Sequence, residues 1–186
     1  MRTRSVVLGA AVLLGLAACD SHADATNDSD PLPPVQLAQQ PAASAGGACI
    51  LWDYAFIKSK IGVTFEVAAS DQVDDTSTCV VQTIAGDWPD LALSVVESTQ
   101  ADAKLFLSDL KPDKATTLKG LGKAAYRLNT AASGGHGPSV EIGWLSEAKQ
   151  LQTLRFTFAK TAKAADVTAM NTRLLSLAKA MDTTAG

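Results

Sequence analysis

The sequence predicts an α+β fold: an antiparallel β-sheet of about six strands with helices packed on one face, in the order α-βββ-α-βββ-α. Three observations lead to this prediction. Apolar residues recur at helical spacing at the start, in the middle and at the end of the folded region. Short β-rich runs lie between these segments. The connections between neighbouring runs are short, which favours antiparallel pairing.

The first helix is predicted from Ile50, Tyr54, Ile57 and Ile61. Their spacing of four, three and four residues places them on one face of a helix. Gly62 follows at the position of a C-terminal cap, where glycine tolerates the left-handed backbone. We therefore expect this face to pack against the sheet.

A first group of three strands is expected after this helix. Apolar and polar residues alternate over 63–67, which is typical of a strand with one buried face, and the β-rich runs 79–84 and 91–96 predict two more strands. Residues 70–77 are polar and acidic and predict a surface loop. Residues 85–90 contain glycine, aspartate and proline and predict a turn.

The middle helix is predicted over residues 99–110, with Ser98 or Thr99 as its N-cap and Pro112 as its stop. The next element is a strand over 125–129, which follows a turn that contains two glycines.

The chain is expected to close with a hairpin and a helix. A glycine-rich loop at 133–138 precedes two strands, 140–145 and 151–158, that pair around the turn at 146–150. Apolar residues then recur every three or four positions, as expected for the core face of a final helix. These residues are Val167, Met170, Leu174, Leu177 and Met181.

The N-terminus has the three parts of a secretory signal. Arg2 and Arg4 precede an apolar run, which ends at Leu16-Ala17-Ala18-Cys19. The run is shorter than the roughly 20 residues that span a bilayer. The tetrapeptide is similar to the bacterial lipobox, in which the cysteine receives a diacylglycerol and the signal is cut just before it. We therefore predict a signal peptide over 1–18 and lipidation of Cys19; the alternative is an ordinary signal with a chance cysteine.

The rest of the chain divides into a tether, a domain and a tail. Residues 19–47 hold four aspartates and four prolines, with no Lys, Arg, Phe, Tyr or Trp, which predicts a disordered tether. Residues 48–182 form the predicted α+β domain, and 183–186 are a short tail. Without residues 1–18 the chain has 14 basic and 19 acidic residues, a net charge of −5, so nucleic acid is an unlikely partner.

Two cysteines remain after lipidation, Cys49 and Cys79. In an oxidising compartment an even number of cysteines favours a disulfide, and this one would close about 30 residues. The alternative is a metal or redox site. Such sites usually have CxxC spacing or paired histidines, and neither is present.

The sequence contains none of the common catalytic motifs, and we predict no enzyme activity, no catalytic residue, no metal site and no cofactor. Two residues stand out as contacts for a ligand or partner. His136 lies in the glycine-rich loop, where an exposed loop residue is the plain interpretation. Trp88 lies in the predicted turn at 85–90, where ordinary packing is the alternative.

The chain resembles a family of actinobacterial lipoproteins that share an extracellular domain of unknown function. The resemblance lies in the lipobox ending at Cys19, the tether, Cys49 before a helix, Cys79 opening a strand, and the Gly-Leu-Gly-x-Ala-Ala-Tyr element within 118–126. It implies a secreted, disulfide-tied α+β domain over 48–182 and no particular activity.

Three functions follow as hypotheses. The first is a lipid-anchored module on the extracytoplasmic side of the cell membrane, which binds an envelope protein or small ligand through the turn and loop end of its sheet. It predicts an exposed apolar patch or pocket that includes Trp88 or the 133–138 loop. The second is a structural or accessory lipoprotein without a ligand pocket. The third is a hydrolase, in which His136 would lie within hydrogen-bond reach of a Ser, Thr or carboxylate.

Overall fold

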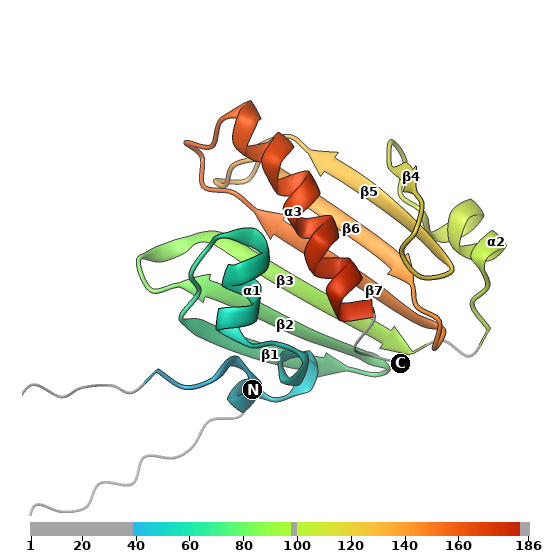
Figure 1. The fold of residues 1–186 in the computed structure, drawn as a ribbon, viewed down its shortest axis with the longest axis horizontal. Coiled ribbons are helices and arrows are strands. Elements are labelled where there is room, and N and C mark those ends of the chain that lie inside the picture. Colours follow the sequence, from blue (N-terminus) through green and yellow to red (C-terminus); the bar gives the residue numbers. More distant parts are fainter. Residues whose placement is uncertain (1–38, 98–99, 183–186) are drawn as a thin grey trace, which may run out of the picture. The chain divides into compact units, whose positions relative to one another are not determined.

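The computed structural model of the chain describes residues 39–97 and 100–182 (Figure 1). Two 3₁₀ turns, η1 (Ala42–Ala45) and η2 (Gly47–Leu51), precede helix α1 (Tyr54–Ile61). Strands β1 (Val67–Val73), β2 (Thr76–Thr83) and β3 (Gly86–Glu97) follow. Helix α2 (Ala103–Leu105) continues into a π-helical turn, η3 (Phe106–Leu110). The chain then forms β4 (Thr116–Leu118), β5 (Ala124–Thr130), β6 (Ser139–Leu145), β7 (Gln150–Thr157) and helix α3 (Ala164–Asp182).

The strands form one antiparallel sheet of seven strands in the order β1-β2-β3-β7-β6-β5-β4. The predicted α+β class and antiparallel sheet are confirmed. The additional strand is β4, whose three residues at the sheet edge are too few for a periodic pattern. Strand β7 pairs with β3, so the last hairpin joins the two groups of strands.

Helices α1 and α3 lie on one face of this sheet (Figure 1). The strands point alternate residues toward them, and paired residues such as Leu93, Leu154 and Ile142 form continuous apolar rows across the sheet. Helix α3 covers these rows with Leu174 and Leu177, which are completely buried. The residues that recur at helical spacing in the sequence therefore form the face of α3 that packs on the sheet.

A second, smaller core lies on the opposite face. Its residues alternate with those of the first core along β5 and β6, and they are covered by Phe106 of η3. Tyr126 stacks on Phe106 with ring centroids 5.7 Å apart. Gly143 is paired with Tyr126, and a Cβ at this glycine would collide with the tyrosine ring. The α2–η3 segment therefore covers the face opposite α1 and α3.

The structure corrects three sequence-based expectations in the first half. The strand expected over 63–67 begins only at Val67. Residues 70–77 are not a loop: they form the second half of β1, turn at Asp74 with a φ of 50°, and begin β2. The polar residues of β1 are tolerated because an edge strand with one open face keeps them in water. Ile50 is not part of α1 but lies in η2 with 67% of its surface exposed, because Asp53 caps α1 by accepting a hydrogen bond from Phe56 N.

Two other boundaries shift. The predicted helix over 99–110 is shorter, with Asp102 as its N-cap, since its carboxylate accepts a hydrogen bond from Leu105 N at 2.8 Å. The expected caps Ser98 and Thr99 lie outside the described residues. Gly62 ends α1 in the left-handed conformation, as expected.

Residues that the sequence analysis assigned to the tether already pack on the domain. Ala42 is completely buried, and the Gln39 side chain donates a hydrogen bond to the Phe65 carbonyl at 3.2 Å. The Ser70 hydroxyl donates to the Ala45 carbonyl. The segment 39–47 therefore lies against the beginning and middle of β1.

Candidate functional site

The two domain cysteines form a disulfide. Cys49 in η2 is bonded to Cys79 in β2, with Cα atoms 4.9 Å apart, and both residues are completely buried. Cys79 points toward the helix side of the sheet because it pairs in register with Leu93, a core residue. The disulfide therefore links η2, the segment before α1, to the buried face of β2. Cys19, the predicted lipidation site, lies outside the described residues.

The structure brings Trp88 and His136 together, although they are 48 residues apart in the sequence. Trp88 lies near the start of β3, and His136 lies in the loop before β6. Their ring centroids are 5.1 Å apart, with the planes tilted by 51°. Both side chains are partly buried. Trp88 belongs to a strand rather than to a turn, because β3 begins at Gly86, earlier than its apolar run suggested.

The backbone fixes where His136 is presented. Gly137 N donates to the Phe158 carbonyl at 2.8 Å, and Phe158 N donates to the Pro138 carbonyl at 2.9 Å, so the β6–β7 pairing extends to the base of the loop. A Cβ at Gly137 would collide with the Ala159 carbonyl. Nδ1 of His136 lies 2.6 Å from the Gly137 carbonyl oxygen. When Nδ1 carries the proton, this contact leaves Nε2 as an acceptor.

A polar row lies beside this aromatic pair on the open face of the sheet. Asp90 is paired with Thr157, and Thr157 is paired with Ser139 of β6. Burial raises the pKa of Asp90 above its usual value, against the opposing effects of hydrogen bonding to Thr157 and the charge of Arg155. The Oδ1 atom of Asp90 is buried and has no hydrogen-bond partner among the described residues. The Asp90 carboxylate therefore accepts from Thr157, while its Oδ1 atom is an acceptor without a donor among the described residues.

A second polar pair lies further along the same face. The Tyr126 hydroxyl donates to Oε1 of Glu141 at 2.9 Å. Burial raises the pKa of Tyr126, and the adjacent Glu141 charge raises it further. The tyrosine therefore stays protonated and continues to donate to the carboxylate. Tyr126 belongs to the second core through its contact with Phe106. Arg155 is paired with Glu141, so both side chains project on this same face of the sheet.

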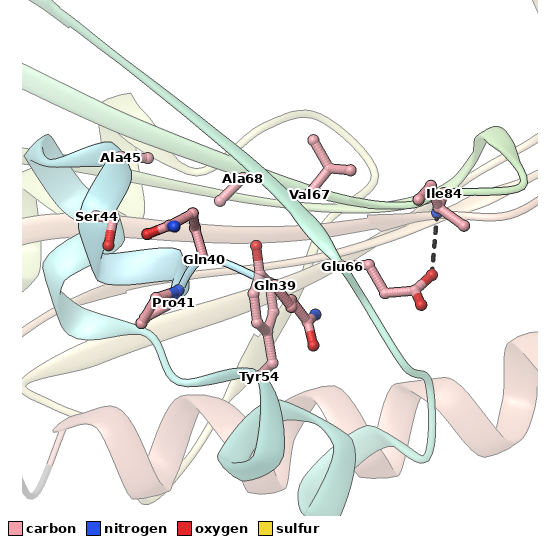
Figure 2. Close-up of a pocket in the computed structure, with 10 residues that line it drawn as sticks. All are labelled: Gln39, Gln40, Pro41, Ser44, Ala45, Tyr54, Glu66, Val67, Ala68 and Ile84. Atoms are coloured by element: carbon pink, nitrogen blue, oxygen red, sulfur yellow. Dashed lines mark hydrogen bonds between the residues drawn. The ribbon is translucent and has the colours of Figure 1, made fainter. Parts of the chain in front are cut away.

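A groove opens beside the edge strand β1 (Figure 2). Its volume is about 530 Å³, and Figure 2 shows Gln39, Gln40 and Tyr54 on one wall with Val67 and Ala68 on the other. Ile84 lies at one end, where its backbone N donates to Glu66 Oε2 at 3.2 Å. Val67 is 46% exposed and Ile84 is 77% exposed.

Sequence analysis missed this groove. Its first wall comes from residues 39–45, whose composition predicts disorder. The signal that was available is Val67 and Ile84, two apolar residues at the ends of predicted β-runs. Sequence alone does not show that a third segment borders them.

A second hollow, of about 370 Å³, lies on the helix face between the start of α3 and the sheet. Pro89 lines it, beside Phe158 and Arg173. The Arg173 guanidinium donates to the Ile61 carbonyl at 3.3 Å and so ties α3 to the end of α1. These contacts assign Arg173 a role in joining the two helices.

The hydrolase hypothesis requires a Ser, Thr or carboxylate hydrogen-bonded to His136. Within the described residues, the ring of His136 contacts the Gly137 carbonyl and the Trp88 ring instead. The two hollows described above are lined by other residues. The two predicted contact residues therefore lie side by side and partly buried, and neither hollow includes Trp88 or the 133–138 loop.

No helix within residues 39–97 and 100–182 is long and apolar enough to cross a membrane. Comparison of the chain with protein-family models, with curated proteins and with solved structures finds no match. The resemblance to lipoproteins stated above therefore stays an expectation.

Proposed function

We propose that this protein is a lipid-anchored module of the cell envelope, exposed on the extracytoplasmic side, that binds an envelope protein or small ligand through the turn and loop end of its sheet. The observation that carries the proposal is the contact between Trp88 and His136. Aromatic side chains at a surface supply large contact area at low entropic cost, and tryptophan is enriched among residues that dominate binding.

The surroundings of this pair support a polar ligand contact. Asp90 and Arg155 follow on the same face of the sheet, so an acceptor and a cation flank the aromatic pair. A binding site combines apolar contact area with a few polar groups that orient the ligand, and this arrangement has both.

The anchor part of the proposal rests on the sequence. The lipobox-like residues before Cys19 favour diacylation, and two acyl chains give stable anchoring where one gives marginal binding. The Cys49–Cys79 disulfide supports an oxidising compartment, because such bonds persist mainly in exported proteins. In this proposal the lipid on Cys19 inserts into the membrane, and the domain lies on the extracytoplasmic side.

The anchor is tested by intact-mass measurement and cell fractionation. The expected product is a chain that begins at Cys19, is heavier by two or three acyl chains and is found in the membrane fraction. The Cys19→Ala variant should appear in soluble fractions. A wild-type chain that carries no lipid would contradict the anchor and leave the binding site untouched.

The binding site is tested by photo-cross-linking in the native host, with a photoreactive residue placed at position 88, 136 or 119. Lys119 is exposed beside β4, at the far edge of the sheet, and serves as the control. We expect the same adduct from positions 88 and 136 and none from 119. Equal adducts from all three positions, or none from 88 and 136, would contradict the proposal and favour an accessory lipoprotein without a ligand site.

Intrinsic fluorescence gives a second readout. Of the three tryptophans, Trp52 and Trp144 are buried at 3% and 0% exposure, so quenching by a soluble quencher reports mainly on Trp88. A ligand at this site should protect Trp88 from quenching, and the protection should be absent in the Trp88→Phe variant.

A further inference from the structure

The outer edge of β1 is unpaired. β1 is at the end of the sheet order, and among the described residues its seven residues make backbone hydrogen bonds in the ladder with β2 and in no other. A strand edge of this kind presents a row of N–H and C=O groups to any extended chain that approaches it.

Two of the usual protections of an edge strand, a Lys or Pro residue and a β-bulge, are absent from β1. It contains neither Lys nor Pro, and its register with β2 runs without a bulge from Val67 to Val73. The opposite edge differs. β4 has only three residues and is followed directly by Lys119. Both features disfavour the pairing of another strand at this edge. The β4 edge is therefore a shorter template for an added strand than the β1 edge.

Apolar and polar contacts are available on both sides of the open edge. On the open face of the sheet, Val67 is 46% exposed and Val73 is 62% exposed. On the helix side, the groove of Figure 2 is lined by Ala68 together with Tyr54 and Gln40. A strand added to β1 would direct alternate side chains onto the open face and into this groove.

The negative charge around the β1 edge favours a positively charged partner. Residues 61–103 contain no Lys, Arg or His and eight acidic residues. Four of these acidic residues lie at the ends and in the middle of β1 and are exposed, namely Glu66, Asp71, Asp74 and Asp75. Opposite charges across an edge assist association and fix the register, whereas like charges oppose it.

We infer that the β1 edge, together with the groove beside it, binds an extended basic segment of a partner protein as an additional strand. This inference does not rest on the Trp88–His136 pair, which joins β3 to the loop before β6 and involves no residue of β1. Main-chain hydrogen bonds supply the pairing, the groove receives alternate side chains, and the acidic residues around β1 favour lysine or arginine on the incoming strand.

The test uses the full mature chain and a synthetic heptapeptide, acetyl-Lys-Val-Lys-Val-Lys-Val-Lys-amide. Two control peptides are matched to it. In one, glutamate replaces every lysine; in the other, alternate residues are N-methylated, which removes backbone donors on one edge and keeps the charge. Hydrogen exchange measured by mass spectrometry locates binding, and a titration gives the affinity.

We expect the lysine peptide to slow amide exchange in the segment 67–73 and to lose affinity as salt is raised. The glutamate and N-methylated peptides should bind at least about tenfold more weakly, since each factor of ten corresponds to 1.4 kcal/mol. In the chain, Val67→Lys with Asp71→Lys should weaken binding by a similar factor. The control, Leu105→Lys with Leu110→Lys, places lysines at apolar positions that are 41% and 44% exposed elsewhere and should change affinity less than twofold.

Three outcomes would overturn the inference. Equal binding of the N-methylated peptide would show that no strand is added. Protection away from residues 67–73 would place the peptide elsewhere. Protection of 67–73 that depends on protein concentration without peptide, with dimers seen by sedimentation, would identify a second copy of this chain as the occupant. Circular dichroism of each variant shows that a lost affinity is not lost folding.

Discussion

The two ends of the sheet differ in how they are covered. At β5 and β6 both faces are packed, by α3 on one side and by Phe106 of η3 on the other. At β1 to β3 one face carries α1 and η2, while no helix within residues 39–97 and 100–182 packs on the opposite face. The helix-side core is continuous across both ends. The β5–β6 end is therefore packed on both faces, whereas the β1–β3 end has one face available for contacts.

Charge follows the same division along the chain. Residues 61–103, which form β1 to β3, have eight acidic residues and no basic ones, whereas residues 104–182 have twelve Lys and Arg and six acidic residues. A net charge of −5 for the mature chain hides this separation. The open half thus has a single sign of charge, which steers partners of the opposite sign toward it.

The largest effect is expected at the doubly covered end. Phe106→Ala removes the cover of the second core, and Phe→Ala changes at buried sites cost about 3–5 kcal/mol. Leu110→Ala, in the same turn and 44% exposed, serves as the control and should cost far less. Urea unfolding of both variants measures this difference. A cost for Phe106→Ala as small as that of Leu110→Ala would mean that η3 does not cover this face.

The next effect concerns the singly covered end. The double change Cys49→Ala and Cys79→Ala removes a crosslink that closes a separation of 30 residues, which is worth about 3.5 kcal/mol in the chain-entropy picture. Denaturation of the oxidised protein, the reduced protein and the variant should show the last two alike and less stable. If the open end were held by packing alone, all three would unfold together.

A smaller effect is expected at Gly143. A Cβ there collides with the Tyr126 ring, so Gly143→Ala displaces the ring from Phe106 and Glu141 at a cost of about 1–3 kcal/mol. Gly86→Ala in β3 is the control, because no atom lies within 4 Å of its added Cβ. Thermal unfolding measures both variants. Equal melting temperatures would show that Tyr126 does not need the glycine.

The smallest effect concerns pH and the open face. Because the folded-state pKa of Asp90 is raised, this residue contributes stability that is present below its unfolded pKa of about 3.9 and is lost as the pH rises through the folded value. Asp90→Asn should lack this loss, so its stability relative to wild type should increase with pH above that point. Chemical denaturation at a series of pH values measures the difference.

The control for this titration is Asp75→Asn, which removes a carboxylate from the exposed turn between β1 and β2. The same rising difference in Asp75→Asn would attribute the effect to net charge rather than to the burial of Asp90. A flat difference in Asp90→Asn would show that this carboxylate is as well solvated in the folded chain as in the unfolded one.

Sequence patterns predicted the buried elements better than the exposed ones. The helical spacing of Met170, Leu174 and Leu177 found the face of α3 that packs on the sheet, and the hairpin of β6 and β7 was placed within a residue or two. Burial of one face makes apolar residues recur at the period of the helix or strand, and this periodicity can be recognised in the sequence. β1 was missed in part because an edge strand with an open face has no such period, so Asp71 and Gln72 looked like a loop.

By itself, the sequence determined the α+β class, the core faces of the helices, the oxidised cysteine pair and the acidity of residues 61–103, because each depends on residue type and local spacing. Tertiary structure alone decided that Trp88 meets His136, that residues 39–45 border a groove with Val67 and Ile84, and that β1 rather than β4 is the open edge. These contacts join segments that are far apart in the chain. No local pattern specifies them, since they follow from strand order and from which surfaces the core leaves uncovered.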